Sequence, residues 1–339
     1  MAVTQVEVTA PSPTTRVLVV GLGSIGRRHA RLLSTRPDVE LLVCDPVADH
    51  REAARAWCRH EFTAYEQALA ARPDIVVVCT PNPLHVPMGR AALAAGADLL
   101  VEKPLSDTLN TARELVDEAG RQQRLLHVGY MLRWDLGLRR LKEIVEQGGI
   151  GQPVGGRAMV GTYITLLSAK TTYRGCDANG LVLDYTHLID YTRWFFGEVK
   201  QVAATSATIG NRALRPEPNV FQMLLTMRSG ALVQIHLDYV QHPERHTFEI
   251  HGDSGTLHYD FLTGEIRHYP DGREHRWNSL DVEPFHTRRD DLFLTEHEHV
   301  IAARRGGLVP LVSGSDGIAA LEVAEAAIAA AAAGQTSVI

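Results

Sequence analysis

Residues 16–26, RVLVVGLGSIG, decide the fold, because an apolar strand there runs directly into a glycine-rich turn. Gly21 permits the positive φ of a tight turn, Gly23 permits close approach of a pyrophosphate, and Gly26 permits the next helix to pack on the strand. The N-terminus of that helix offers free N–H groups and a partial positive charge to phosphates. This order predicts a dinucleotide site rather than a merely structural βαβ turn. The turn residues expected to hold the cofactor are Gly21, Gly23, Ser24, Ile25 and Gly26.

A carboxylate follows the second expected strand. Residues 41–44 are apolar, and Asp45 comes directly after them. An acidic residue about 20 residues beyond a glycine turn can accept hydrogen bonds from the adenosine ribose. A carboxylate there also repels the 2′-phosphate of NADP, and Arg51 offsets that repulsion only in part. The sequence therefore predicts NAD as the cofactor, with NADP disfavoured.

Size and charge narrow the function classes. The chain has 339 residues, enough for two domains, and 34 basic against 40 acidic residues give a net charge of −6. No basic run marks a nucleic-acid site, and no apolar run reaches the length of a membrane span. Residues 1–15 lack the basic head and apolar core of a secretory signal and are expected to be a disordered lead-in. We expect a cytoplasmic protein with reduced thiols, because no CxxC pair occurs among Cys44, Cys58, Cys79 and Cys176.

Residues 16–134 alternate apolar strands with amphipathic helices. Near-continuous apolar runs such as 75–79 indicate a parallel sheet that is buried on both faces. The region is therefore predicted to be an NAD(P)-binding Rossmann domain with a doubly wound parallel sheet. The strands are expected at 16–20, 40–44, 74–79, 98–101 and 125–128. The helices are expected at 24–35, 49–59, 65–71, 84–95 and 108–122.

Residues 135–339 follow a different pattern and are predicted to form a substrate-binding and oligomerisation domain of the α/β class. A helix at 135–147 precedes longer strands with period-two alternation, which indicate a large, mostly antiparallel open sheet. Helices are expected at 180–196 and at 316–333, the second capped by Ser315 and ended by Gly334. Too few helices follow to cover both faces of the sheet, so we expect a homodimer or homotetramer. The strands are expected at 154–163, 199–208, 219–227, 231–239, 246–252 and 255–260.

Three polar segments follow expected strands of the first domain. Ligands of open α/β sheets bind at the carboxyl ends of the strands, so these segments should border one crevice with the glycine turn. Cofactor contacts are expected from Thr80, Asn82, His85, Glu102 and Lys103, and substrate contacts from Tyr130 and Arg133. Lys103 is expected to donate from its ammonium to a substrate oxygen beside the nicotinamide. The alternative is a surface lysine paired with Glu102.

Asp184, His187 and Asp190 have helical spacing in the second domain. An imidazole beside a carboxylate suits proton transfer to or from a carbinol oxygen. Asp184 as a helix cap with His187 in the core is the alternative. No cysteine or third ligand accompanies the pair, so no metal is expected. The remaining histidines are interpreted as solvated or interface residues of little functional weight: His242, His246, His251, His286, His297 and His299.

These motifs together resemble the Gfo/Idh/MocA oxidoreductases. The resemblance covers nearly the whole chain from Arg16 and rests on the segments GLGSIGRRHA, TPNPLH, VEKP, GYMLRW, the 184–190 helix, HGDSGTL and FLTEHEHVIAARRGG. It implies a Rossmann domain followed by an α/β domain with a large open sheet. It also implies NAD(P)-linked oxidation or reduction of a sugar or cyclitol carbon.

The same resemblance implies roles for single residues. Lys103 matches the catalytic lysine of the family, His187 its acid/base histidine, and Asp184 the acidic partner. The family usually separates that Asp and His by four positions, whereas this chain has three, so Tyr185 is a rival proton donor. Further substrate contacts are expected from the segment that contains Tyr163, Tyr173 and Arg174.

The sequence as a whole predicts an NAD-dependent oxidoreductase acting on a CH–OH group of a sugar-like or cyclitol-like substrate. Three alternatives stay open: a ketoreductase of a nucleotide-linked sugar, a non-catalytic NAD(P)-binding regulator, and a hydrolase or lyase with a tightly held cofactor. The sequence leaves undetermined the particular substrate, the direction of the reaction and whether the substrate carries a nucleotide or phosphate.

Overall fold

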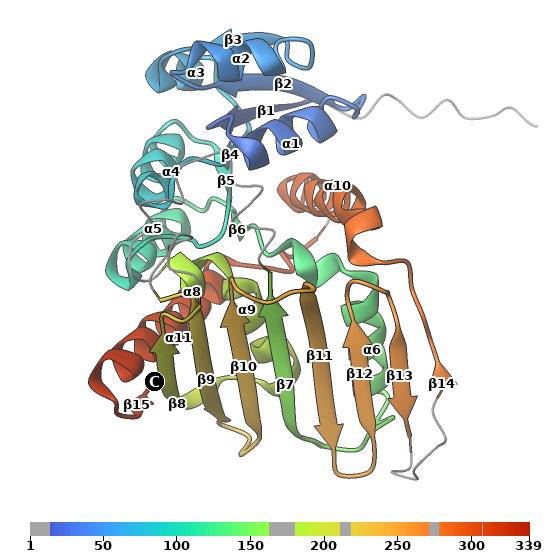
Figure 1. The fold of residues 1–339 in the computed structure, drawn as a ribbon. Coiled ribbons are helices and arrows are strands. Elements are labelled where there is room, and N and C mark those ends of the chain that lie inside the picture. The colour runs from blue at the N-terminus through green and yellow to red at the C-terminus, as the bar shows by residue number, and fades with distance from the viewer. Residues whose placement is uncertain (1–13, 163–179, 211–217, 271–277, 307) are drawn as a thin grey trace, which may run out of the picture.

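The computed structural model describes residues 14–162, 180–210, 218–270, 278–306 and 308–339. The described chain forms two sheets, each with its own helices, one above the other in Figure 1. Tyr163, Tyr173, Arg174 and Cys176 lie outside the described residues. Cys44, Cys58 and Cys79 are free thiols. None of the described helices is long and apolar enough to span a membrane.

The first sheet has six parallel strands in the order β3-β2-β1-β4-β5-β6. All four residues of β4, IVVV, are buried, because helices cover both faces of a doubly wound sheet. The predicted Rossmann sheet is confirmed. The strands are β1 (Thr15–Val20), β2 (Val39–Cys44), β3 (His60–Phe62), β4 (Ile75–Val78), β5 (Asp98–Val101) and β6 (Leu126–Val128). The helices are α1 (Ser24–Leu33), α2 (Ala48–Ala54), α3 (Tyr65–Ala70), η1 (Asn82–Leu84), α4 (His85–Ala94) and α5 (Leu109–Arg121).

The second sheet has nine strands in the order β14-β13-β12-β11-β7-β10-β9-β8-β15. All pairs are antiparallel except β7 with β10, which confirms the mostly antiparallel sheet. The strands are β7 (Pro153–Gly161), β8 (Val199–Ala207), β9 (Val220–Met227), β10 (Leu232–Asp238), β11 (Arg245–Gly252), β12 (Thr256–Asp260), β13 (Ile266–Tyr269), β14 (Asn278–Ser279) and β15 (Ser337–Val338). The helices are η2 (Met131–Trp134), α6 (Leu136–Glu146), α8 (Gly180–Asp184), α9 (Thr186–Phe196), α10 (Phe285–Arg304) and α11 (Gly314–Ala333).

Strands β3, β13, β14 and β15 were not predicted. Each has at most four residues and lies at or next to a sheet edge, so none carries a sustained apolar alternation. In β3, His60 and Glu61 are exposed, and this short strand pairs only with β2. The sequence signal is weak at the edges because edge strands bury little apolar surface.

Two helix predictions need correction. The expected helix at 180–196 is broken at Tyr185, whose backbone (φ −107°, ψ 26°) separates α8 from α9. The last helix begins two residues earlier than expected: Ser313, not Ser315, is the N-cap and forms a capping box with Asp316. Gly334 ends that helix with φ 62°, as expected.

Helix α10 links the two domains. It follows the second sheet in sequence but packs against α1 and η2, beside the first domain in Figure 1. Val300 and Ile301 of α10 join the same core cluster as Val17 and Leu41 of the parallel sheet. Residues from the far end of the chain therefore form one wall of the space between the domains.

Among the described residues, helices cover only one face of the second sheet. Helices α6 and α9 lie behind the strands in Figure 1, and the outward-facing Leu224 and Leu232 are about half exposed. Along β9, buried and more accessible residues alternate, so a single face of the strand meets the core.

Candidate active site

A cavity of about 310 Å³ lies between the two domains and collects most of the expected catalytic residues. Lys103 enters it from the end of β5, and Asp184 and His187 enter it from α8 and α9. Ile25, from the first turn of α1, lines the same cavity. The described lining residues are Ile25, Glu102, Lys103, Gly129, Met131, Leu132, Val160, Thr162, Asp184, Tyr185, His187, Leu188, Glu244, His246, Phe285, Arg289 and Phe293.

The glycine turn leaves room for a phosphate. Gly21 has φ +84°, and a Cβ on it would meet Cys79 and Thr80 backbone atoms at 2.8–2.9 Å. A Cβ on Gly26 would overlap the carbonyl oxygen of Gly21, whereas one on Gly23 would meet nothing within 4 Å. No side chain caps the N-terminus of α1, so its first-turn N–H groups, Ser24 and Ile25 included, are available to an anion. The turn therefore fits the pyrophosphate of a dinucleotide.

Asp45 is buried at the end of β2 and held by the protein itself. Its Oδ2 accepts from the backbone N–H of Leu22 at 2.6 Å, and its Oδ1 accepts from Val47 at 2.8 Å. His50 lies 3.1 Å from Oδ2, and Arg51 donates to the Asp45 carbonyl at 2.6 Å. The carboxylate is fixed beside the glycine turn, where its remaining lone pairs can accept from a ribose.

His85 joins two of the strand-end segments. Its ring nitrogens lie 2.8 Å from the carbonyl oxygens of Pro104 and Thr80. Burial lowers the pKa of His85, while these two carbonyls act in the opposite direction. The hydroxyl of Thr80 is buried without a partner among the described residues, and Asn82 begins the short helix η1. His85 thus connects the segments that follow β4 and β5, and the hydroxyl of Thr80 remains available to a ligand.

Lys103 is held by the second domain. Its Nζ donates to the carbonyl oxygen of Asp184 at 2.8 Å, and Tyr239 donates from its hydroxyl to the Asp184 carboxylate at 2.7 Å. The break between α8 and α9 frees that carbonyl from helical bonding at this point. The alternative, a side-chain pair of Lys103 with Glu102, is not what the structure has: Glu102 Oε2 accepts from the backbone N–H of Lys103 at 3.1 Å.

His187 is a partly buried imidazole whose Nδ1 is shielded from solvent. Burial, followed by the charges of Lys103, His246 and Arg289, places its pKa well below 6.5. Its Nδ1 has no partner among the described residues. Tyr130, itself buried, meets the imidazole edge-on with ring centroids 5.5 Å apart. Tyr130 therefore packs against His187, and it is not among the described residues that line the cavity.

A buried polar chain runs from Glu102 to α10. His29 Nε2 lies 2.9 Å from Glu102 Oε1, and His29 Nδ1 lies 2.7 Å from His297 Nε2. A carboxylate only accepts, so His29 donates to Glu102. Burial works against the charge of Glu102, but the bond and charge of His29 and the charge of Lys103 outweigh it and lower its pKa. The residue beside Lys103 is thus fixed as a carboxylate.

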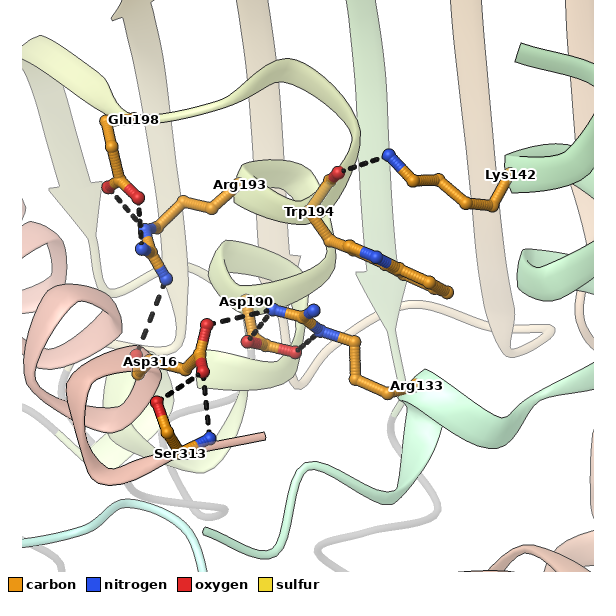
Figure 2. Close-up of polar contacts among 8 residues, drawn as sticks. All are labelled: Arg133, Lys142, Asp190, Arg193, Trp194, Glu198, Ser313 and Asp316. Carbon is orange, nitrogen blue, oxygen red and sulfur yellow. Dashed lines mark hydrogen bonds and ion pairs between the residues drawn. The ribbon is translucent and has the colours of Figure 1, made fainter. Parts of the chain in front are cut away.

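Arg133 and Asp190 form an ion pair (Figure 2), and neither is among the described residues that line the cavity. Arg133 donates from Nε and Nη2 to the two oxygens of Asp190 at 2.7 and 2.8 Å, and their side chains are 6% and 1% exposed. Asp316 lies 3.5 Å from the same guanidinium, whose carbon is 5.0 Å from the centre of the Trp194 ring. The contacts of Nε and Nη2 join η2, α9 and α11, and the substrate contact expected of Arg133 stays a prediction.

Three ionisable residues of the cavity were not predicted from the sequence as site residues: Glu244, His246 and Arg289. His246 is not solvated as expected; it is buried, stacked on Phe261 with ring centroids 3.7 Å apart, and its pKa is lowered to about 3 by burial. His297 is also buried rather than solvated. Arg289 had no sequence signal, because it belongs to a helix that folds back from the second domain. Among the described residues no group of three or more His, Cys, Asp or Glu side chains could hold a metal ion.

Two family models match the chain. Residues 15–130 match an oxidoreductase family with an NAD-binding Rossmann fold, and residues 142–338 match its C-terminal alpha/beta domain. Inositol 2-dehydrogenase 4 of Saccharopolyspora erythraea is 29% identical over 93% of both chains. D-apiose dehydrogenase of Paraburkholderia graminis is 26% identical over 94% of this chain and 88% of its own. The crystal structure of myo-inositol 2-dehydrogenase from Lactobacillus plantarum superposes with a TM-score of 0.84 at 25% identity, covering 96% of this chain and 99% of that one.

Proposed function

The chain belongs to the Gfo/Idh/MocA oxidoreductase family, and on this premise we propose that it is an NAD-dependent dehydrogenase of a sugar or cyclitol. One observation carries the proposal: Lys103 of the first domain and His187 of the second domain line one cavity together with Ile25, which follows the glycine turn. The relatives named for inositol and for apiose are consistent with a ring substrate that carries several hydroxyl groups.

The chain's own residues account for the proton in such a reaction. Oxidation of a carbinol removes a proton from the hydroxyl oxygen and a hydride from the carbon that carries this oxygen. His187, neutral above its lowered pKa, takes the proton, and the ammonium of Lys103 donates to the oxygen as negative charge develops on it. The Asp184 carbonyl holds the ammonium, and the bond from Tyr239 holds Asp184. Tyr185 also lines the cavity and is the rival proton donor.

The cofactor assignment follows from the residues that fit it. The open space at Gly23 and the uncapped helix at Ser24 and Ile25 accommodate a pyrophosphate. Asp45 is placed to accept from the ribose and to disfavour a 2′-phosphate, so we propose NAD over NADP. Further cofactor contacts are proposed for Thr80, Asn82 and Glu102. When bound, the nicotinamide supplies the hydride acceptor.

A substrate panel tests the proposal directly. Purified enzyme is mixed with NAD or NADP and with cyclitols, aldoses or nucleotide sugars, and NADH absorbance is followed. We expect NADH formation with at least one neutral or acidic polyol, and a higher kcat/KM with NAD. Keto-sugar nucleotides with NADH form the reverse arm of the panel. Cofactor binding without turnover in any arm would make the protein a regulator, and substrate loss without net NADH would make it a hydrolase or lyase.

Assembly is a further part of the proposal. The open face of the second sheet, with Leu224 and Leu232 half exposed, suits contact with a second copy of the chain. We therefore propose a homodimer or homotetramer in the cytoplasm, with residues 16–134 binding the cofactor and residues 135–339 binding substrate and forming the interface. Light scattering should give a dimer or tetramer, and Leu224→Glu with Leu232→Glu should give monomers. A monomeric wild type at micromolar concentration contradicts this.

A further inference from the structure

Helix α10 brings a basic side chain to the candidate active site. Phe285, Arg289 and Phe293 are spaced four residues apart, so they share one face of the helix, and all three line the cavity. Lys103 and Arg289 are the lysine and arginine side chains among the described lining residues. The ammonium of Lys103 is bonded to the Asp184 carbonyl, so Arg289 is the cation that remains to be explained.

Arg289 has unused hydrogen-bonding capacity. Its Nε is buried and has no hydrogen-bond partner among the residues that the structure describes. Burial, followed by the charge of Arg28, lowers the pKa of Arg289. A buried guanidinium donor that is left unsatisfied is costly, and a second cation nearby adds to that cost. Both effects favour a negatively charged group beside Arg289.

The carboxylates whose charge reaches Arg289 are already engaged. Glu102 accepts from His29 and from the backbone N–H of Lys103. Asp290 is paired with Arg28 at 3.3 Å and with Arg31 at 2.5 Å. Across the cavity, Asp184 accepts from Tyr239. Glu102 and Asp290, the carboxylates whose charge acts on Arg289, thus direct both of their oxygens to other donors.

We propose that Arg289 binds the carboxylate or phosphate oxygens of a reactant in this cavity. The planar guanidinium matches a two-oxygen anion in a bidentate pair. The inference rests on the proposed function, since it places a reactant beside His187 and Ile25. Two sources supply such an anion. Ile25 belongs to the phosphate turn, which points to the cofactor pyrophosphate. His187 lines the same cavity as Arg289, which points equally to the carboxylate of an acidic sugar.

Direct binding measurements separate these sources without turnover. Arg289→Gln removes the cation and keeps similar size, and Arg289→Lys keeps charge but loses the bidentate geometry. Arg288→Gln is the matched control, because Arg288 pairs with Glu283 and Asp291 and is not among the described residues that line the cavity. Calorimetry measures NADH binding first, and then D-glucuronate and myo-inositol binding to the enzyme–NADH complex.

The inference predicts a loss of about 10- to 100-fold in one arm, the range expected of a charge-assisted hydrogen bond. If the anion is the pyrophosphate, Arg289→Gln weakens NADH binding by that factor. If the anion belongs to the substrate, Arg289→Gln leaves NADH binding unchanged and weakens glucuronate binding while sparing myo-inositol. Arg289→Lys should lie between wild type and Arg289→Gln in the affected arm, and it substitutes for Arg289→Gln if that variant does not fold.

The proposal is overturned if both arms of the Arg289 variants stay within about twofold of Arg288→Gln, a difference of about 0.4 kcal/mol. It is also overturned if Arg288→Gln loses as much affinity as Arg289→Gln. A failure of the proposed dehydrogenase activity would look different, because it would abolish NADH formation across the substrate panel while leaving these affinities measurable.

Discussion

Replacing Arg133 by Met should destabilise the protein without changing substrate affinity. The guanidinium is 6% exposed and makes two hydrogen bonds to Asp190, whose side chain is 1% exposed. Met fills much of the same volume but leaves the Asp190 carboxylate buried without its main partner. Breaking a buried ion pair on one side costs about 3–5 kcal/mol, because an uncompensated charge remains inside.

The expected loss of stability in Arg133→Met can be expressed as a change in Tm. For domains of about 150–250 residues, 1 kcal/mol shifts Tm by about 2–4 °C, so Arg133→Met should lower Tm by about 6–20 °C. Calorimetric unfolding measures this loss, and steady-state kinetics below the transition measure KM. Adding Asp190→Asn removes the stranded charge and should recover part of the lost Tm. The conservative Arg133→Lys should lie between wild type and Arg133→Met, since it keeps the charge but not the bidentate pair.

One combination of results would contradict a structural role for Arg133. If Arg133→Met leaves Tm within about 2 °C, a change of under 1 kcal/mol, while KM rises more than about tenfold, Arg133 serves the substrate as its position in the sequence suggested. The absence of Arg133 from the described residues that line the cavity would then not have indicated its role.

Four further predictions concern the site and its surroundings. Lys103→Ala should lower kcat by about 10²–10³-fold with NADH binding intact, as measured by fluorescence titration. His187→Ala should lower kcat by about 10²–10⁴-fold. In the wild type, kcat/KM for oxidation should stay constant down to pH 6.5 and fall only at lower pH, where the imidazole becomes protonated. If the variant keeps the wild-type pH profile, the proton transfer belongs to Tyr185. Gly26→Ala should lower Tm because its Cβ overlaps the Gly21 carbonyl, whereas Gly23→Ala should keep Tm and weaken NADH binding; the reverse order contradicts the turn geometry. Buried His127 and His246 have pKa values of about 3 against 6.5 when exposed, so the unfolded state binds protons that the folded state refuses. As the pH falls below 6.5, each of these histidines should therefore lower the free energy of unfolding by about 1.4 kcal/mol per pH unit, which urea unfolding measures. Equal stability at pH 7 and pH 5 would contradict this prediction.

The sequence predicted those parts of the fold whose signals are local. Glycine spacing and continuous apolar strands located the parallel sheet, since a strand such as β4 is buried on both faces. Alternation along β9 and β10 located the second sheet, because these strands bury one face and leave the other more accessible. Lys103 and His187 were found because each follows or belongs to an element with a clear pattern.

The parts that could not be predicted depend on contacts between distant segments. Arg289 lines the cavity only because α10 returns to pack on α1. The pairing of Arg133 with Asp190 joins η2 to α9, and the chain from Glu102 through His29 to His297 joins β5, α1 and α10. The break at Tyr185 likewise has no local signal, although it lets the Asp184 carbonyl hold Lys103.

Transfer of deuterium from substrate to cofactor tests the central claim most directly. A polyol that is active in the panel is labelled with deuterium at its carbinol carbons, and the reduced cofactor is examined by proton NMR and mass spectrometry. Hydride transfer from the substrate should place one deuterium at C4 of the nicotinamide per turnover and no label from deuterated water. The rate of this transfer should fall with Lys103→Ala and with His187→Ala. Product formation with an unlabelled cofactor would contradict hydride transfer in the cavity between the two domains.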